Sequence, residues 1–289
     1  MRAFFAPQVD RPAELQDLVA RAAFYLAHLE LESLVFVSEA PLRYELEVPD
    51  SFDPRIGDRF ARIAQRLEFL SPDDPDAIDR AMDRADLFLL WRLEESCSDL
   101  WQERLARRRG TQCFRVDKHQ VRLEGSFYIE AGFRNEKDSE QIDERNRAAF
   151  QSMRERLGPF ERAYVFGTGP SADLYPRFDF DDGLAVVCNT IVKDRDLMDH
   201  VRPKILCFAD PIFHFGCSRY AARFRDEVEQ AAERHDFTIC IPRKYFALFV
   251  DLLPDLESRT IGIPVDPHRS FNLDLSETFE LKSIDNVLT

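Results

Sequence analysis

The sequence predicts an α/β protein made of two Rossmann-like domains with mainly parallel sheets. Short apolar runs rich in β-branched residues alternate with longer segments in which apolar residues recur every three or four positions. Runs such as residues 184–188 lack polar alternation, which is typical of strands buried on both faces of a parallel sheet. A highly charged segment near the middle of the chain separates two such series, so we expect two domains.

The first predicted domain covers residues 1–133 and begins with a helix. Asp10 and Pro12 mark the start of that helix, whose apolar side chains follow a period of 3.6 residues. Gly57 and Gly110 are isolated, so this domain shows no phosphate-binding loop. The remaining expected elements are strands at 33–37, 85–91 and 111–116 and helices at 58–67, 77–84 and 98–108.

A long helix is expected to link the two domains across residues 134–158. Its apolar stripe includes Phe150 and Met153, its middle is charged, and Gly158 ends it. The second predicted domain then covers residues 159–289 and resembles a nucleotide-binding Rossmann-like unit.

The second domain opens with a strand at 163–166 and a glycine-rich turn. The turn consists of Gly167, Thr168, Gly169, Pro170 and Ser171. Glycines at these positions let backbone N–H groups approach a ligand without an intervening Cβ, and Ser171 is suited to cap a following helix. The turn is interpreted either as a phosphate loop or as an ordinary connection between a strand and a helix.

Polar residues follow the next predicted strands. Asn189 follows strand 184–188, and Asp210 follows strand 204–209. Together with Ser171, they are expected just beyond the carboxyl ends of successive strands, where open α/β sheets bind ligands. Arg243 and Lys244 follow a further strand at 237–241, which lies between helices expected at 218–234 and 245–252. These two cations either neutralise a phosphate or sugar carboxylate, or begin the next helix and face water.

This set of motifs resembles glycosyltransferase family 42, the bacterial sialyltransferases that use CMP-sialic acid, over residues 162–289. It is also similar to a related group that includes motility accessory factors and 6-hydroxymethylpterin diphosphokinases. Thr168 and Asp210 stand where the sialyltransferases usually carry Asn. The resemblance implies that residues 167–171, Asn189 and Asp210 hold a nucleotide or nucleotide-sugar, with a glycan or another hydroxyl compound as acceptor.

The resemblance assigns no catalytic base in this chain. The family continues with a catalytic His beyond the position that corresponds to Thr289, so the second domain is expected to be truncated, either as a fragment or as a retained binding half. Asp210 and His214 are the remaining catalytic candidates, although His214 is also interpreted as a packed or surface residue. The alternatives are a Mg²⁺-dependent diphosphokinase-like enzyme that uses ATP, and a non-catalytic binding or assembly module.

Composition narrows the function classes. The net charge of −14 and the pI near 5.0 disfavour nucleic-acid binding, and the basic run at 104–109 is expected to be a solvated helix end. The six cysteines form no CxxC pair, so no structural metal site is predicted and no cofactor is firmly implied. No apolar run approaches the roughly 20 residues of a transmembrane helix, and a cytoplasmic location is expected. The sequence leaves open whether the protein is a homo-oligomer.

Overall fold

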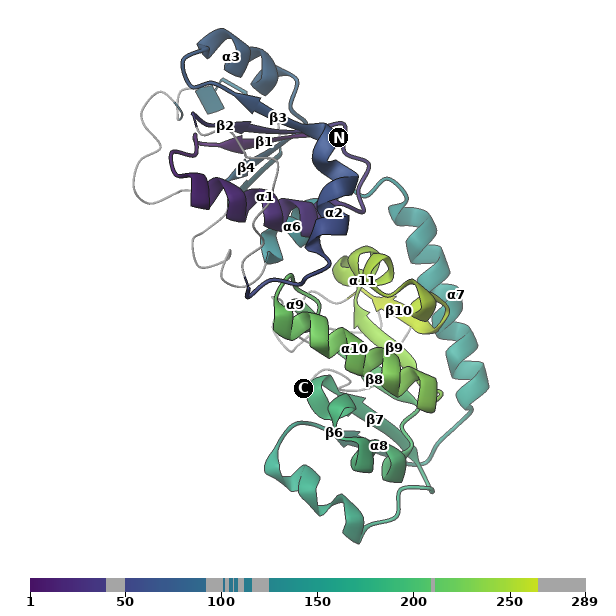
Figure 1. Ribbon diagram of the computed structural model, residues 1–289. Helices are drawn as coiled ribbons and strands as arrows, with labels where there is room; N and C mark the ends of the chain where they lie inside the picture. Colours follow the sequence, from purple (N-terminus) through teal and green to yellow (C-terminus); the bar gives the residue numbers. More distant parts are fainter. Residues whose placement is uncertain are drawn as a thin grey trace. The chain divides into compact units, whose positions relative to one another are not determined.

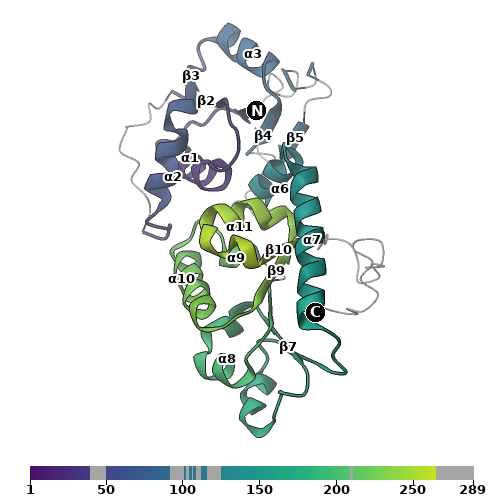
Figure 2. The same cartoon turned by 90° about the vertical axis from the view of Figure 1, so that its right-hand side faces the viewer.

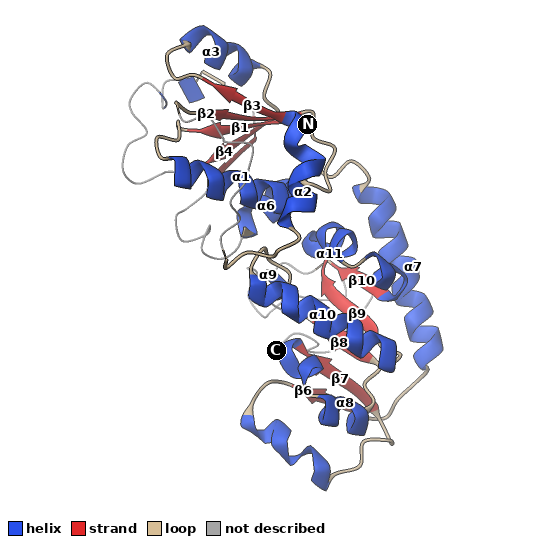
Figure 3. Cartoon of the chain, viewed as in Figure 1, coloured by secondary structure: helices blue, strands red, loops and turns tan. Residues whose placement is uncertain are grey.

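A computed structural model describes residues 1–39, 50–91, 101, 104–105, 107–108, 112–115, 125–208 and 211–264. The chain divides into two compact units, Met1–Glu136 with Gly216–Arg219, and Lys137–Phe215 with Tyr220–Thr289. Each unit contains a five-stranded sheet in which every neighbouring pair is parallel, with helices between the strands (Figure 1, Figure 3). The predicted α/β fold class with two Rossmann-like domains is therefore confirmed.

The first sheet has the strand order β3-β2-β1-β4-β5. Its strands are β1 (Arg2–Ala6), β2 (Ser33–Val37), β3 (Leu67–Leu70), β4 (Leu87–Leu90) and β5 (Gln112–Arg115). The helices of this unit are α1 (Pro12–Leu26), α2 (Ile56–Ile63), α3 (Pro75–Asp83) and α6 (Ser126–Arg134), with a short 3₁₀ turn η1 (Ala64–Arg66). The central strand β1 and the edge strand β3 were not among the elements expected from the sequence.

Two consecutive phenylalanines in β1 supply both faces of this sheet. Phe4 packs with residues of α3 in one apolar cluster, and Phe5 stacks on Phe36 with ring centroids 4.3 Å apart on the other face. Successive side chains of a strand point to opposite faces, so the pair anchors both layers of helices. On the face of Phe5, Tyr25 from α1 stacks on Tyr128 from α6, with centroids 5.7 Å apart.

The basic run at residues 104–109 is not simply a solvated helix end. Arg104 is only 7% exposed, and its Nε lies 3.4 Å from a carboxylate oxygen of Asp79 on α3. Arg108 pairs with Asp79 and, at 2.7 Å, with Asp83. The expectation is wrong because the carboxylates that pair with this run lie on a different helix, about 25 residues earlier in the sequence.

The second sheet has the strand order β10-β9-β8-β7-β6, so sequence neighbours are also spatial neighbours. Its strands are β6 (Ala163–Phe166), β7 (Leu184–Cys188), β8 (Ile205–Cys207), β9 (Thr238–Pro242) and β10 (Thr260–Ile263). The α-helices are α7 (Ser139–Leu157), α8 (Arg195–Val201), α9 (Pro211–His214), α10 (Arg219–Arg234) and α11 (Phe246–Leu252). The 3₁₀ helices are η2 (Pro170–Arg177), η3 (Asn189–Lys193), η4 (Arg243–Tyr245) and η5 (Pro254–Arg259).

Strand order explains how the second sheet is covered. Connections between parallel strands are almost always right-handed, so a sequential order places the connecting helices on one face. Figure 2 shows α8 and α10 on one side of the strands and α7 on the other. The expected linking helix thus belongs to the second unit, where Phe150 and Met153 pack against apolar side chains of β7, β8, β9 and β10.

Helix α7 also contacts β10, the last strand in the order of the described sheet. The backbone N–H of Gly262 donates to the side-chain Oδ1 of Asn146, at 2.8 Å, and Asn146 is 1% exposed. A Cβ at position 262 would lie 3.0 Å from Asn146 Nδ2 and 3.1 Å from the Cβ of Phe246, so glycine permits this close approach. An edge strand otherwise presents unpaired N–H groups, and one of them is satisfied here by a helix side chain.

We expect Asn146→Ala to lower the free energy of unfolding of the second unit by about 1–3 kcal/mol, because the buried Gly262 N–H loses its acceptor. Both tryptophans, Trp91 and Trp101, precede residue 137, so hydrogen exchange at Gly262 and circular dichroism in urea are better probes than tryptophan fluorescence. The control is Arg147→Ala, at an exposed position of the same helix. Equal effects of the two substitutions would contradict the assignment.

Among the described residues, no helix is both long enough and apolar enough to cross a bilayer.

Candidate nucleotide-binding site

The candidate site lies along the edge formed by the carboxyl ends of β6 to β9. Strands β6 and β7 pair with Phe166 opposite Val187, and Cys207 of β8 lies opposite both Cys188 and Cys240. The segments that follow these strands therefore line the same edge of the sheet. The structure brings the glycine turn after β6, Asn189 after β7 and Arg243 after β9 to this edge, in that order. Asp210, which was expected here as well, lies outside the described residues.

The glycine turn presents backbone donors to solvent. Residues 167–171 are exposed, and the one turn hydrogen bond here runs from the Ala172 N–H to the Gly169 carbonyl, at 2.9 Å. Within the described part of the chain, the N–H groups of Thr168, Gly169 and Ser171 have no acceptor. Unpaired N–H groups at the start of a helical turn form a concave donor set suited to an anion.

The helix after the turn differs from the expectation. It is the 3₁₀ helix η2, its N-cap is Gly169, and no side chain caps it. Ser171 lies inside the first turn and is not the capping residue, so that prediction is wrong. Pro170, at the first position, fixes φ and has no N–H, which suits a helix start and places the cap one residue earlier than Ser171.

The protein's own packing does not require the two glycines of the turn. A Cβ built on Gly167 or Gly169 would meet no heavy atom within 4 Å, and neither residue has a positive φ. Gly183 in the same unit differs, since its Cβ would lie 2.7 Å from the Tyr164 ring and 2.9 Å from a backbone oxygen. Open space above an exposed, donor-rich backbone is what close approach of a ligand needs.

Asn189 begins the 3₁₀ helix η3 with a left-handed backbone, at φ 50°. Asparagine tolerates this conformation better than other non-glycine residues, which explains the residue type at a sharp turn directly after a buried strand. The sequence placed Asn189 at a strand end, whereas its backbone conformation became evident only in the structure.

His214 lies at this edge but is packed. Its ring stacks on Phe224, with centroids 4.3 Å apart, and the residue is 8% exposed. Burial, assisted by the nearby positive charge of Lys193, lowers the pKa of His214 to about 4. The imidazole is therefore neutral at pH 7 and a weak proton acceptor, which disfavours it as a general base. Lys193 in turn lies over the ring of Tyr220, 5.4 Å from its centroid.

Arg243 and Lys244 both contact other side chains of the protein. Arg243 is 4% exposed; its Nε donates to Asp143 on α7, and its Nη2 donates to the Ser139 carbonyl at 3.3 Å. The Nζ of Lys244 lies 5.6 Å from the centroid of the Tyr245 ring. Arg243 thus ties the end of β9 to α7. The sequence could not reveal this pairing, because Asp143 lies 100 residues earlier.

The first unit contains a feature that sequence reasoning missed. Its strand order reverses between β1 and β4, and such a switch point is where open α/β sheets usually form a ligand crevice. Here Trp91 follows β4 and is 8% exposed; its indole N–H donates to the Pro7 carbonyl at 2.8 Å, and its backbone N–H donates to Ala6. The indole therefore occupies the position between the two strand ends. The segments after β2 and β4, at residues 40–49 and 92–100, lie outside the described residues.

No protein-family model, curated protein or solved structure matches this chain.

Proposed function

We propose that the second unit binds a nucleotide-activated sugar at the carboxyl edge of its sheet, and that the protein transfers the sugar to a hydroxyl acceptor. The observation that carries this proposal is the exposed glycine turn, in which the N–H groups of Thr168, Gly169 and Ser171 have no acceptor among the described residues. Phosphate oxygens are strong hydrogen-bond acceptors, and two glycines without steric neighbours allow them to reach the backbone.

The electrostatics favour recognition by neutral dipoles. The chain carries a net charge of −14, which repels anions at long range. Arg243, a buried cation near this edge, is already paired with Asp143. We therefore assign the phosphate recognition to short-range backbone N–H groups, and we assign the Asn189 carboxamide, which follows the neighbouring strand, to another part of the nucleotide.

The same N–H groups give the site its proposed catalytic role. Glycosyl transfer from a nucleotide donor builds negative charge on the departing phosphate, and preorganised donors stabilise that charge. Within the described residues we assign no general base, since the lowered pKa of His214 makes it a weak proton acceptor.

The direct test is calorimetric titration of the chain with CMP, UDP, GDP and ATP, each with and without Mg²⁺. Metal-independent binding of CMP or another nucleoside phosphate supports the proposal and identifies the donor class to screen for sugar transfer. Binding of ATP only in the presence of Mg²⁺ would favour the diphosphokinase-like alternative. Absence of binding by all four would overturn the assignment of the site.

We expect the double substitution Ser171→Ala and Asn189→Gly to weaken nucleotide binding by more than about tenfold, since each lost hydrogen bond contributes about 1 kcal/mol. Glycine is the better replacement at position 189, because it removes the carboxamide while keeping the φ of 50° without strain. Affinity would be measured by the same titration, and the unfolding midpoint would establish that the variant is folded. Unchanged affinity in a folded variant would exclude these side chains from the site.

A further inference from the structure

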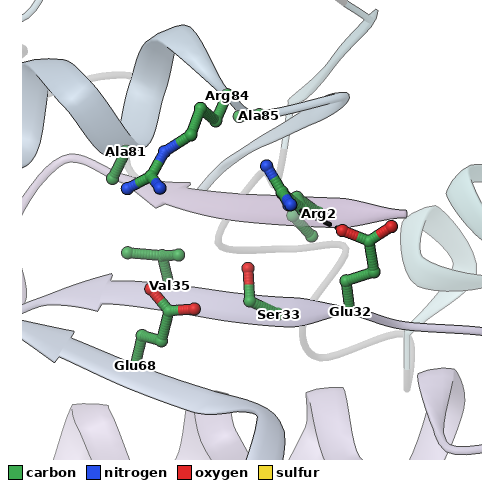
Figure 4. A pocket seen from close by; sticks show the side chains of 9 residues that line it. Arg2, Glu32, Ser33, Val35, Glu68, Ala81, Arg84 and Ala85 are labelled. Atoms are coloured by element: carbon green, nitrogen blue, oxygen red, sulfur yellow. Dashed lines mark hydrogen bonds and ion pairs between the residues drawn. The ribbon is translucent and has the colours of Figure 1, made fainter.

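The first unit has a pocket at the amino-terminal edge of its sheet, opposite the strand ends where α/β proteins usually bind ligands. Figure 4 shows this pocket, which has a volume of about 170 Å³. Its polar lining comes from the first residues of β1 and β2, which are Arg2 and Ser33, from Glu68 of β3, and from Arg84 at the end of α3. Glu32 completes the polar lining.

Two of the charged side chains neutralise each other. The Nε of Arg2 donates to a carboxylate oxygen of Glu32, at 2.7 Å. The other two charged side chains, Arg84 and Glu68, form no ion pair with each other. Arg84 donates its Nε to the Arg80 carbonyl at 3.2 Å, and neither its terminal nitrogens nor the Glu68 carboxylate have an ion-pair partner within the described ranges. In Figure 4, Arg84 reaches into the pocket from α3 while Glu68 rises from the strand on the facing wall.

Ser33 adds an independent observation. The residue is 6% exposed, and its hydroxyl has no hydrogen-bond partner among the residues that the structure describes. Figure 4 shows this hydroxyl pointing from β2 into the pocket, on the same wall as Glu68. This hydroxyl is therefore available to exchange a hydrogen bond with a polar group in the pocket.

We propose that this pocket binds a small zwitterion of the α-amino acid class. The ligand carboxylate pairs with the guanidinium of Arg84, and its ammonium group pairs with Glu68 and donates to the Ser33 hydroxyl. Both side chains belong to exposed residues, so an anion would pair with Arg84 alone and a cation with Glu68 alone. A zwitterion pairs with both side chains at once, and the side chains of Val35 and Ala81 give its carbon skeleton an apolar surface.

The pocket volume limits the size of the ligand. A cavity of about 150 Å³ accommodates benzene, so the volume of about 170 Å³ suits an amino acid with a small side chain. The site lies in the first unit and shares no residue with the proposed nucleotide site, so it can be tested separately.

The test is titration of the ¹⁵N-labelled full chain with alanine, followed by amide chemical shifts, alongside lactate and ethylamine as analogues that lack the ammonium and the carboxylate respectively. We expect saturable shifts with alanine that include the amides of Ser33 and Glu68, and an affinity for each analogue at least about tenfold weaker. Equal binding of alanine and either analogue would overturn the zwitterion assignment. Absence of saturable shifts with alanine up to concentrations on the order of 10 mM would overturn the site itself.

Variants identify the pairing within the site. Arg84→Gln and Glu68→Gln should each weaken alanine binding at least about tenfold, because each removes one charge that the ligand pairs with. Arg80→Gln is the matched control, since Arg80 is an exposed cation of the same helix and does not line the pocket. The affinity of this variant for alanine should stay within about twofold of the wild-type value. Wild-type affinity in both the Arg84 and the Glu68 variants would overturn the pairing.

Discussion

Replacing Gly167 and Gly169 together with alanine is expected to lower nucleotide affinity about 30- to 150-fold while leaving the protein folded. Two methyl groups above the turn would keep phosphate oxygens from the N–H groups, and losing one or two charge-assisted hydrogen bonds weakens binding by about 2–3 kcal/mol. A Cβ at either position meets no heavy atom within 4 Å, and neither glycine has a positive φ. We therefore expect the free energy of unfolding to stay close to that of the wild type. Calorimetric titration and urea denaturation of the same preparation measure the two effects.

The matched control is Gly57→Ala. Gly57 also has no heavy atom within 4 Å of a built Cβ, but it lies in α2 of the first unit, where alanine should raise stability slightly and leave nucleotide affinity unchanged. If the double variant at the turn binds nucleotide as tightly as the Gly57 control, the backbone of the turn is not the phosphate site.

We expect the free energy of unfolding to depend on pH through His214. The folded pKa of His214 is about 4, below its ordinary value of 6.5, because burial and Lys193 disfavour the imidazolium. Between these two values the unfolded chain binds a proton that the folded chain does not, so stability rises with pH across this window and falls as the medium is acidified. This histidine makes the free energy of unfolding about 3 kcal/mol higher above pH 6.5 than well below pH 4.

The measurement is urea denaturation at pH 7 and pH 5, for the wild type and for His214→Gln. Glutamine does not titrate, so the variant should lose less stability than the wild type on acidification, while the charge of Lys193 remains in both proteins. The rest of the chain is the same in the two proteins, so its contribution cancels in the comparison. Equal losses of stability in the two proteins would show that His214 is accessible to protons in the folded state.

Local sequence patterns predicted most elements but missed three strands for identifiable reasons. Residues 33–37, 184–188 and 237–241 are predominantly apolar runs, and strands were found at or within one residue of them. Strand β3 is an exposed edge strand with no buried residue, and β10 contains Gly262 between two isoleucines, so neither gives a clear signal. Strand β1 begins at the second residue, where no preceding helix marks it, although its run of Ala3 to Ala6 is apolar.

The sequence by itself determined the alternation of strands and helices and the glycine turn after β6, because both depend on the order and the backbone freedom of neighbouring residues. Only the tertiary structure decided the strand orders, which place a switch point in the first sheet and none in the second. It also decided that Arg243 pairs with Asp143, that His214 is stacked on Phe224, and that Arg84 and Glu68 face each other across a pocket. These arrangements join residues that are distant in sequence, and their energies depend on burial and on partners that a local pattern does not contain.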